Sequence, residues 1–169
     1  MFPDPWLSRW LPLLMTRSQG MSVLEIGCGH GDDTAMLAGA GLQVIAFDLL
    51  AILVRIGKTR VPSAQIERRD TRAPFPASAR DVGVVLASLS LHYVGWDDTV
   101  NIVRHIRAVL RPDGVLLCGV NSTEDSNFGA TGYEQLKPDY FLVKGELKRF
   151  LDEKSARAQS LTAGSLNYR

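Results

Sequence analysis

The stretch VLEIGCGHGDDT, residues 23–34, predicts a short strand, a tight turn and the start of a helix. Its apolar run ends at three alternating glycines, Gly27, Gly29 and Gly31, and helix-forming residues resume directly afterwards. Because glycine tolerates a positive φ and has no Cβ, such a turn can bend sharply and let a ligand lie against the main chain. The N–H groups that open the helix face the same place. The stretch therefore predicts a ligand-binding corner.

The spacing of the glycines narrows the kind of ligand. A dinucleotide fingerprint requires Gly-x-Gly-x-x-Gly, but the third glycine of that frame falls on Asp32 or Thr34. The stretch contains Glu-x-Gly-x-Gly-x-Gly instead, from Glu25 to Gly31. This pattern resembles motif I of the class I S-adenosylmethionine-dependent methyltransferases.

The composition is that of a globular chain of one domain. Of the 169 residues, 46% are hydrophobic and 22% are charged, and the formal net charge of +1 gives no strong field for nucleic acid or a lipid surface. Two cysteines, Cys28 and Cys118, are too few for a disulfide framework, and with the three histidines they match no metal-ligand spacing. We therefore expect a cytoplasmic protein with no metal, no nucleic-acid partner and no membrane partner.

The N-terminal segment 6–15 is apolar and predicts a short amphipathic helix. It is too short to span a membrane and is interrupted by Pro12, so it is interpreted as neither a signal peptide nor a transmembrane segment. Trp6 and Trp10 fall on one face of this helix. They either pack on the sheet as core or cover the ligand corner as a lid.

Acidic residues follow the next two predicted strands. The strand at 43–47 ends at Asp48, and a carboxylate at this place in a β-α-β nucleotide site accepts the ribose hydroxyls. The alternative is that Asp48 only caps the helix predicted at 49–58. The mixed strand at 64–69 ends at Asp70, which either serves the ligand or forms a turn before a proline-bearing loop.

A nearly continuous apolar run at 81–87 predicts a central parallel strand that is covered on both faces. The segment that follows, 88–94, resembles the fourth motif of the same methyltransferases, where the chain leaves the sheet beside the methionine end of the cofactor. A helix with one apolar stripe, a turn at 111–114 and a strand at 115–120 come next.

The last third of the chain departs from this alternation. Residues 121–132 are polar and contain glycine, which predicts a long loop with a functional role. A helix is predicted at 144–153 with three buried apolar residues, Leu147, Phe150 and Leu151, and the tail 158–169 has the pattern of one more weak strand.

The alternation of strands and helices predicts an α/β fold with an open, mostly parallel, Rossmann-like sheet and helices on both faces. We interpret residues 1–169 as a single methyltransferase domain, with a lid helix at 1–20, a cofactor-binding core at 21–120, and a substrate loop with an incomplete C-terminal part at 121–169. The small size, the Trp-rich leader and the polar loop are similar to small bacterial small-molecule methyltransferases, including the tellurite-resistance type.

The resemblance implies transfer of a methyl group from S-adenosylmethionine to a small-molecule acceptor, with the protein mainly aligning the reactants. It assigns cofactor contacts to the glycine corner, the strand-end acids and the start of the fourth motif: Glu25, Gly27, Gly29, Gly31, Asp48, Asp70, Thr71 and Ser88. His92 is the candidate general base or substrate contact, or else a histidine that only packs at a strand end. Candidate substrate contacts are the aromatic and amide side chains Trp6, Trp10, Tyr93 and Asn121.

Two other kinds of protein remain open as alternatives. A catalytically silent binding module would keep the same fold as a partner or sensor. A nicotinamide-dependent reductase is the other alternative, although it requires the third glycine that this turn lacks.

The resemblance also implies a sheet that is larger than this chain can complete. The family fold inserts an antiparallel strand beside the strand at 115–120, and too few residues follow 153 for a hairpin of two strands. We therefore expect the final strand to be missing. The exposed sheet edge would lead to self-association, unless the tail 160–168 covers it or the natural chain extends beyond Arg169.

Overall fold

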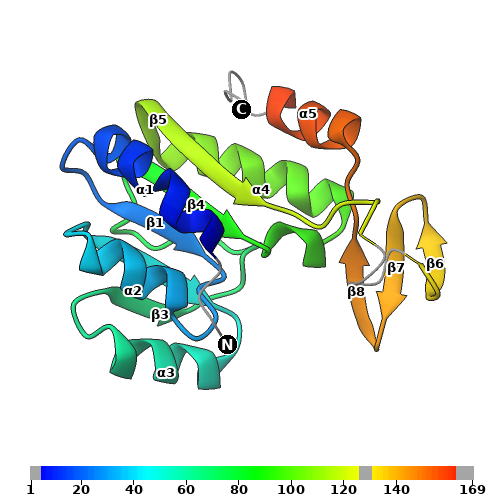
Figure 1. The fold of residues 1–169 in the computed structure, drawn as a ribbon, viewed down its shortest axis with the longest axis horizontal. Coiled ribbons are helices and arrows are strands. Elements are labelled where there is room, and N and C mark those ends of the chain that lie inside the picture. Colours follow the sequence, from blue (N-terminus) through cyan, green and yellow to red (C-terminus); the bar gives the residue numbers. More distant parts are fainter. Residues whose placement is uncertain (1–4, 126–130, 163–169) are drawn as a thin grey trace.

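The computed structural model describes residues 5–125 and 131–162, which form two β-sheets with helices around the larger one (Figure 1). The elements are α1 (Pro5–Ser18), β1 (Val23–Ile26), α2 (Asp32–Gly39), β2 (Val44–Asp48), α3 (Ala51–Arg60), β3 (Gln65–Arg68), β4 (Val82–Ser88), the 3₁₀ helix η1 (Leu91–Tyr93), α4 (Trp96–Val109), β5 (Leu110–Gly119), β6 (Glu134–Lys137), β7 (Tyr140–Val143), β8 (Glu146–Arg149) and α5 (Glu153–Thr162). In this part of the chain, no helix is long and apolar enough to cross a bilayer.

The larger sheet is parallel throughout, with the strand order β3-β2-β1-β4-β5. The order reverses between β1 and β4, and ligands bind at such switch points, outside the carboxyl ends of the strands. Successive strand residues point to opposite faces, so β1 contributes Val23 to the apolar cluster under α1 and α2, and Leu24 and Ile26 to the cluster under α4. The predicted open, mostly parallel α/β sheet with helices on both faces is confirmed.

Helix α1 packs directly on β4 and β5. Leu7 and Leu14 are fully buried, and Trp6 and Trp10 are half-buried against the same apolar cluster. At Gly83 of β4, an added Cβ would lie 2.5 Å from the carbonyl oxygen of Ser18, so the end of the helix rests on bare backbone. The interpretation of this helix as core is confirmed, while its contact with a ligand stays a prediction.

Strand β5 forms an edge of the sheet, because in the described part of the chain it pairs with β4 alone. The turn predicted at 111–114 lies inside this strand as an irregularity, since Leu110 pairs with Val82 and Val115 with Val84. The residues at 115–117 are only half-buried, unlike those of β4. No antiparallel strand lies beside β5 among the described residues, as the expected loss of the final strand predicts.

The helix predicted at 144–153 is wrong. Residues 146–149 instead form β8 of a second, antiparallel sheet with the order β6-β7-β8, in which Lys144 and Gly145 join β7 to β8, and residues 150–152 lead from β8 into α5. Both turn residues have positive φ, 51° and 84°, as a two-residue hairpin turn requires. Leu147, predicted to be buried, is 42% exposed.

The C-terminal tail also differs from its prediction. Residues predicted as a weak strand from 158 onward continue helix α5 as far as Thr162. The remaining part of that predicted strand, 163–169, lies outside the described residues, as does most of the tail expected to cover β5. Within the loop predicted at 121–132, only 121–125 and 131–132 are described.

Candidate functional site

The three glycines after β1 form a corner at the carboxyl end of the strand. The structural reason why glycine is needed differs from one position to the next. All three have left-handed φ, of 71°, 53° and 82° for Gly27, Gly29 and Gly31. An added Cβ at Gly27 would lie 2.7 Å from the Cβ of Ser90, and one at Gly31 would lie 3.3 Å from the Cα of Gly57. At Gly29 an added Cβ meets no atom within 4 Å. The space beside Gly29 is therefore open to a ligand.

Glu25 stands on β1 just before this corner and is almost fully buried. Its carboxylate accepts a hydrogen bond from the Thr34 hydroxyl of α2. Burial raises the pKa of Glu25 to about 8, and the nearby charges of Asp33, Asp48 and Asp32 raise it further, against the lowering effect of the Thr34 bond. Glu25 therefore carries a proton at neutral pH and sits behind the corner as a neutral group.

Asp48 ends β2 and ties two loops together. Its Oδ2 accepts the Gly29 N–H at 3.0 Å, and its Oδ1 accepts the Leu50 N–H at 2.9 Å. The second bond is the local turn expected of an acid that precedes a helix. The first holds the glycine corner beside the carboxylate. Asp48 is not the cap of α3, because that helix has Leu50 as its N-cap without a side-chain bond, and the ribose role of Asp48 stays a prediction.

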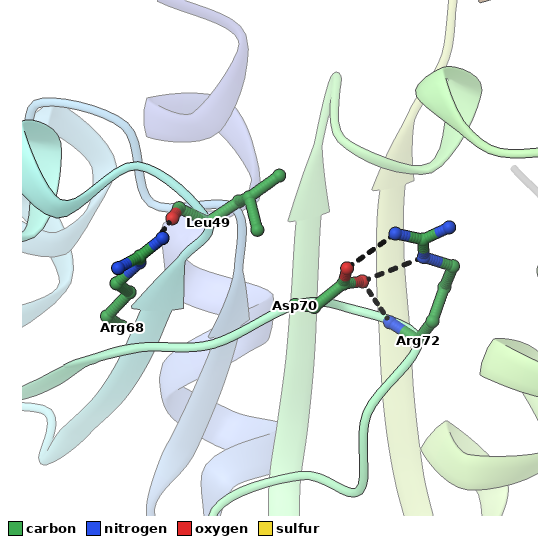
Figure 2. Close-up of polar contacts among 4 residues, drawn as sticks. All are labelled: Leu49, Arg68, Asp70 and Arg72. Carbon is green, nitrogen blue, oxygen red and sulfur yellow. Dashed lines mark hydrogen bonds and ion pairs between the residues drawn. The ribbon is translucent and has the colours of Figure 1, made fainter.

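Asp70 lies beyond the end of β3, and Figure 2 shows its carboxylate engaged by Arg72. Arg72 donates from Nε at 3.0 Å, from its terminal nitrogen at 2.6 Å and from its backbone N–H at 2.9 Å. These bonds lower the pKa of Asp70 to about 2. Thr71 lies between the two residues. Asp70 is thus ionised and already paired with Arg72. A ligand that binds Asp70 would therefore share its carboxylate with Arg72.

The chain that leaves β4 brings two buried polar atoms to the same edge. After Ser88, Leu89 takes a left-handed φ of 49°, and Ser90 then packs against Gly27. The Ser90 hydroxyl and the Nδ1 atom of His92 are both buried and have no hydrogen-bond partner in the described structure. Burial lowers the pKa of His92 to about 4, and the charge of Lys148 lowers it further, so the imidazole is neutral at pH 7.

Three of the four candidate substrate residues lie around the carboxyl ends of β4 and β5. Tyr93 is 46% exposed, and its ring contacts that of His92 in a tilted arrangement, with ring centroids 4.2 Å apart and an interplanar angle of 41°. The ring of Trp6 lies 3.9 Å from an added Cβ at Gly119, the last residue of β5. Asn121 follows β5, and its carbonyl accepts the Leu151 N–H at 2.8 Å. Trp10 lies one turn further along α1, on the core.

Sequence reasoning missed two features of this edge. Ser90 lies two residues after Ser88, but only the structure shows that its hydroxyl is buried without a partner beside Gly27. Leu49 and Leu50 are more than half exposed directly after Asp48, and Arg68 fixes the Leu49 carbonyl by a 3.1 Å bond (Figure 2). The two consecutive leucines directly after a strand-end acid were the sequence signal for an exposed apolar surface on which a ligand could bind.

The parallel strand order and the glycine corner at the switch point define the Rossmann-like fold of class I methyltransferases. A family model described as "Methyltransferase domain" matches residues 23–114, more than half of the chain. The chain belongs to this methyltransferase-domain family. The match begins at β1 and ends inside β5, so it covers the larger sheet and excludes the β6-β7-β8 sheet.

Individual relatives agree with the family. The chain is 30% identical over 101 residues to a trans-aconitate 2-methyltransferase of Paracidovorax citrulli, covering 59% of this chain and 38% of that protein. It is 33% identical over 104 residues to a probable S-adenosylmethionine-dependent methyltransferase of Mycolicibacterium smegmatis, covering 62% and 39%. A crystal structure of an S-adenosylmethionine-dependent methyltransferase from Mesorhizobium loti has a TM-score of 0.73 at 19% identity and covers 95% and 80%. The match to this chain thus spans less than half the length of the Paracidovorax citrulli and Mycolicibacterium smegmatis proteins.

Proposed function

We propose that this chain binds S-adenosylmethionine at the glycine corner and transfers its methyl group to a small-molecule acceptor. The observation that carries the proposal is the open space beside Gly29, whose N–H is held by the Asp48 carboxylate. The cofactor fits the residues present, because a backbone without a Cβ lets a ligand approach closely and Asp48 is placed for ribose hydroxyls. Membership of the methyltransferase family supports the same reading.

The charges around the corner favour this cofactor over a dinucleotide. Asp32 and Asp33 occupy the first turn of α2, where a pyrophosphate would bind the helix N-terminus. Asp32 is paired with Arg60, but both acids still act on Glu25 and raise its pKa. Carboxylates at this position repel a phosphate and attract a cation. A ligand with an ammonium and a sulfonium suits the corner, which argues against a nicotinamide-dependent reductase.

When bound, S-adenosylmethionine supplies a methyl group on a positively charged sulfur, which is already a good leaving group. The work left to the chain is to position the acceptor and exclude water. Ser90 and Gly27 pack together at the methionine side, where the buried Ser90 hydroxyl has no hydrogen-bond partner among the described residues. His92 is neutral at pH 7, but its Nδ1 is buried and its pKa of about 4 makes it a weak base, so we assign it to packing at the end of β4 rather than to proton transfer.

Other residues complete the proposed site. Asp48 binds the ribose and Leu49 lies against the adenine, near Asp70 and Thr71, while Gly31 and Glu25 shape the corner from behind. On the acceptor side, Tyr93, Trp6 and Asn121 surround the ends of β4 and β5, and Trp10 supports the helix that carries Trp6. The small net charge of the chain supports a small molecule rather than nucleic acid as the acceptor. The two free cysteines support a reducing, cytoplasmic location.

Titration calorimetry with a matched pair of glycine variants tests the cofactor site. Gly29 and Gly41 both have left-handed φ, and an added Cβ meets nothing within 4 Å at either position. Gly29→Ala should weaken binding of S-adenosylhomocysteine at least tenfold, because the methyl group would occupy the ligand's space, whereas Gly41→Ala should bind normally. NADH should not bind. Equal affinity in both variants, or binding of NADH alone, would refute the proposed site.

Mass spectrometry of candidate acceptors tests the second half of the proposal. Incubation of the chain with S-adenosylmethionine and a panel of small carboxylic acids, amines and phenols should give a product that is heavier by one methyl group. A chain that binds the cofactor and methylates nothing in such a panel would instead match the catalytically silent binding module.

The open edge of β5 supports a further proposal, that copies of this chain associate through it. Residues 115–120 of this edge strand carry no charge, and such edges recruit other strands. Sedimentation at increasing concentration should show association. A lysine on the edge should suppress it, and Cys118 is exposed there, so Cys118→Lys is the variant to compare. A chain that remains monomeric at every concentration would contradict the proposal.

A further inference from the structure

A cavity lies away from the glycine corner. It has a volume of about 500 Å³ and is lined by residues from the start of α4, the β6–β7 turn, the end of β8 and the start of α5. Its charged and aromatic lining consists of three aspartates, Asp97, Asp98 and Asp139, here called the aspartate group, two cations, Lys137 and Arg149, and two rings, Trp96 and Tyr140. None of the residues assigned to the cofactor lines this cavity.

Arg149 is the unusual member of this set, because only 8% of it is exposed. Its guanidinium carbon lies 5.3 Å from the ring centre of Trp96 and 5.4 Å from that of Tyr140. One terminal N–H donates a long bond, 3.4 Å, to the Thr99 hydroxyl. Among the described side chains, no carboxylate forms an ion pair with it; burial lowers its pKa, and the charges of Asp139 and Asp97 act on it in the opposite direction without reaching ion-pair distance.

A guanidinium keeps its charge when buried, so it needs compensation from its surroundings. The two rings supply part of that through cation–π contact with the charged group. The remaining N–H donors form a planar fork, which matches the two oxygens of a carboxylate. Among the described residues, the fork makes one long hydrogen bond, to Thr99, so the cavity presents a cation that can bind an anionic group.

The start of α4 adds backbone N–H groups, which carry partial positive charge like that of Arg149. The helix has no side-chain cap, and Gly95, Trp96 and Asp97, which form its first turn, line the cavity. The first N–H groups of a helix have no partner inside the helix and carry partial positive charge. Next to them stands the aspartate group, which attracts cations and repels a second anion.

We propose that this cavity binds a small zwitterion of the amino-acid type, with its carboxylate on the Arg149 guanidinium and its ammonium facing the aspartate group. A dicarboxylate or a phosphate ester would place extra negative charge against three carboxylates, and a simple amine would leave Arg149 without an anion. Only a ligand that carries both a negative and a positive group can pair with Arg149 and with the aspartate group at the same time. The inference goes beyond the proposed methyl transfer, because the two sets of lining residues are separate.

A purely structural role for Arg149 makes a different prediction. In that case the residue only fastens β8 to α4 through Trp96 and Thr99, and its removal changes stability without affecting any ligand. Binding measurements on folded variants separate these two roles.

Titration of the whole chain with each of the twenty standard amino acids, followed by calorimetry or ligand-observed NMR, tests the proposal. At least one amino acid should bind with a dissociation constant in the millimolar range or tighter. Acetate and methylammonium, which are the two halves of the zwitterion, should each bind at least tenfold more weakly. The proposal is overturned if no amino acid binds, or if acetate alone binds as tightly as the best amino acid.

Three variants locate the binding. Arg149→Met keeps much of the aliphatic bulk and should weaken binding at least tenfold, because a charged hydrogen bond is lost. Asp139→Asn should weaken it about threefold or more. Asparagine also tolerates the left-handed φ of 57° at this position, so the fold should persist. Arg104→Met is the control, since Arg104 is an exposed residue of α4 that bonds Asn101 and does not line the cavity.

A second set of measurements keeps the test decisive if Arg149→Met unfolds. Arg149→Lys retains the charge but loses the planar fork, so it should bind more weakly while melting close to the wild-type temperature. Affinities unchanged in both Arg149→Lys and Asp139→Asn would overturn the proposal. Binding of S-adenosylhomocysteine should be the same in all four variants, so a failure here is distinguishable from a failure of the proposed cofactor site.

Discussion

Each of the two sheets buries one ionisable side chain, and they do so differently. Glu25 in the parallel sheet is 2% exposed, and Arg149 at the end of the antiparallel sheet is 8% exposed. Glu25 lies among buried strands and accepts one hydrogen bond, from the Thr34 hydroxyl. Its pKa is raised to about 8, so it is protonated at neutral pH. Arg149 remains a cation and is covered by two aromatic rings.

The difference follows from how each region is built. The parallel sheet is covered on both faces, so a charge inside it has no access to water and the carboxyl loses its charge instead. The small antiparallel sheet has an exposed first strand and meets the rest of the molecule at η1 and the end of β8. A charge at that junction can be balanced by rings, helix N–H groups or a ligand. We therefore expect the first region to set global stability and the second to respond locally.

The largest expected effect comes from matched truncations of two phenylalanines. Phe47 of β2 and Phe150 beyond β8 are both fully buried, and each has one aromatic neighbour, Phe75 and Phe141 respectively. Phe47→Ala should lower the free energy of unfolding by about 3–5 kcal/mol and expose every strand of the parallel sheet to hydrogen exchange. Phe150→Ala should raise exchange in β6–β8 while β1, β2 and β4 remain protected. The same exchange pattern in both variants would show that the two sheets unfold as one unit.

A pH effect should come from Glu25. Between pH 4.5 and about 8, the folded chain holds a proton that the unfolded chain has released, so stability falls as the pH rises through this window. The contribution of Glu25 decreases by up to about 1.4 kcal/mol per pH unit and levels off above pH 8. Glu25→Gln keeps the shape and removes the titration, so its stability should depend less on pH. Urea unfolding of both proteins at pH 5, 6, 7 and 8 measures this; parallel curves would contradict a raised pKa.

A third effect, on ligand affinity, should come from Asp48. Asp48→Ala removes the bond to the Gly29 N–H and the proposed bonds to ribose, and a lost charge-assisted bond costs about 1.5–3 kcal/mol. Affinity for S-adenosylhomocysteine should fall about tenfold to a hundredfold by calorimetry. Glu67, on neighbouring β3, is paired with Arg69, so Glu67→Ala is a control that should bind normally. An unchanged affinity in Asp48→Ala would exclude the ribose assignment.

The smallest expected effect concerns Asp70. Arg72→Met should raise the pKa of Asp70 from about 2 toward its usual 3.8, as measured by carbon-13 NMR of the side-chain carboxyl. A lowered pKa stabilises the folded state above pH 3.8, and that stabilisation is lost as the pH falls through about 2. The pair is exposed, so water screens this interaction and its effect on stability should be the smallest of the four. Arg68→Met is the control, because Arg68 bonds the Leu49 carbonyl and no carboxylate (Figure 2). The same rise in both variants would refute the assignment of the low pKa to Arg72.

The parallel region could be predicted from the sequence because local signals and long-range packing agree there. The apolar runs at 43–47 and 81–87 are strands, and the glycines at 27, 29 and 31 all take positive φ. Asp48 was predicted as a site residue from its place at the end of a strand. Its hydrogen bond with the Gly29 N–H could not be predicted, because it depends on the pairing of β1 with β2. The open Gly29 space and the orphaned Ser90 hydroxyl depend on atoms that are far apart in sequence, so only coordinates reveal them.

The antiparallel region could not be predicted by the same reasoning. Leu147, Phe150 and Leu151 recur at the spacing of a helix face, and that period led to the wrong element. The decisive signal was Lys144-Gly145, a turn with two positive φ values between two runs of four residues. The cavity around Arg149 has no local signature, since Trp96, Asp139 and Arg149 come from three separate segments.

The bare contact between Ser18 and Gly83 has a consequence for how the chain is made. Helix α1 leaves the ribosome well before β4, the strand on which it rests, because about 65 residues separate the two positions. At about 5–20 residues per second, this separation corresponds to roughly 3–13 s of synthesis. During that time Leu7 and Leu14 have no sheet to cover them. Helix α1 is thus synthesised well before the strands on which it packs, and it acquires its tertiary contacts with them late.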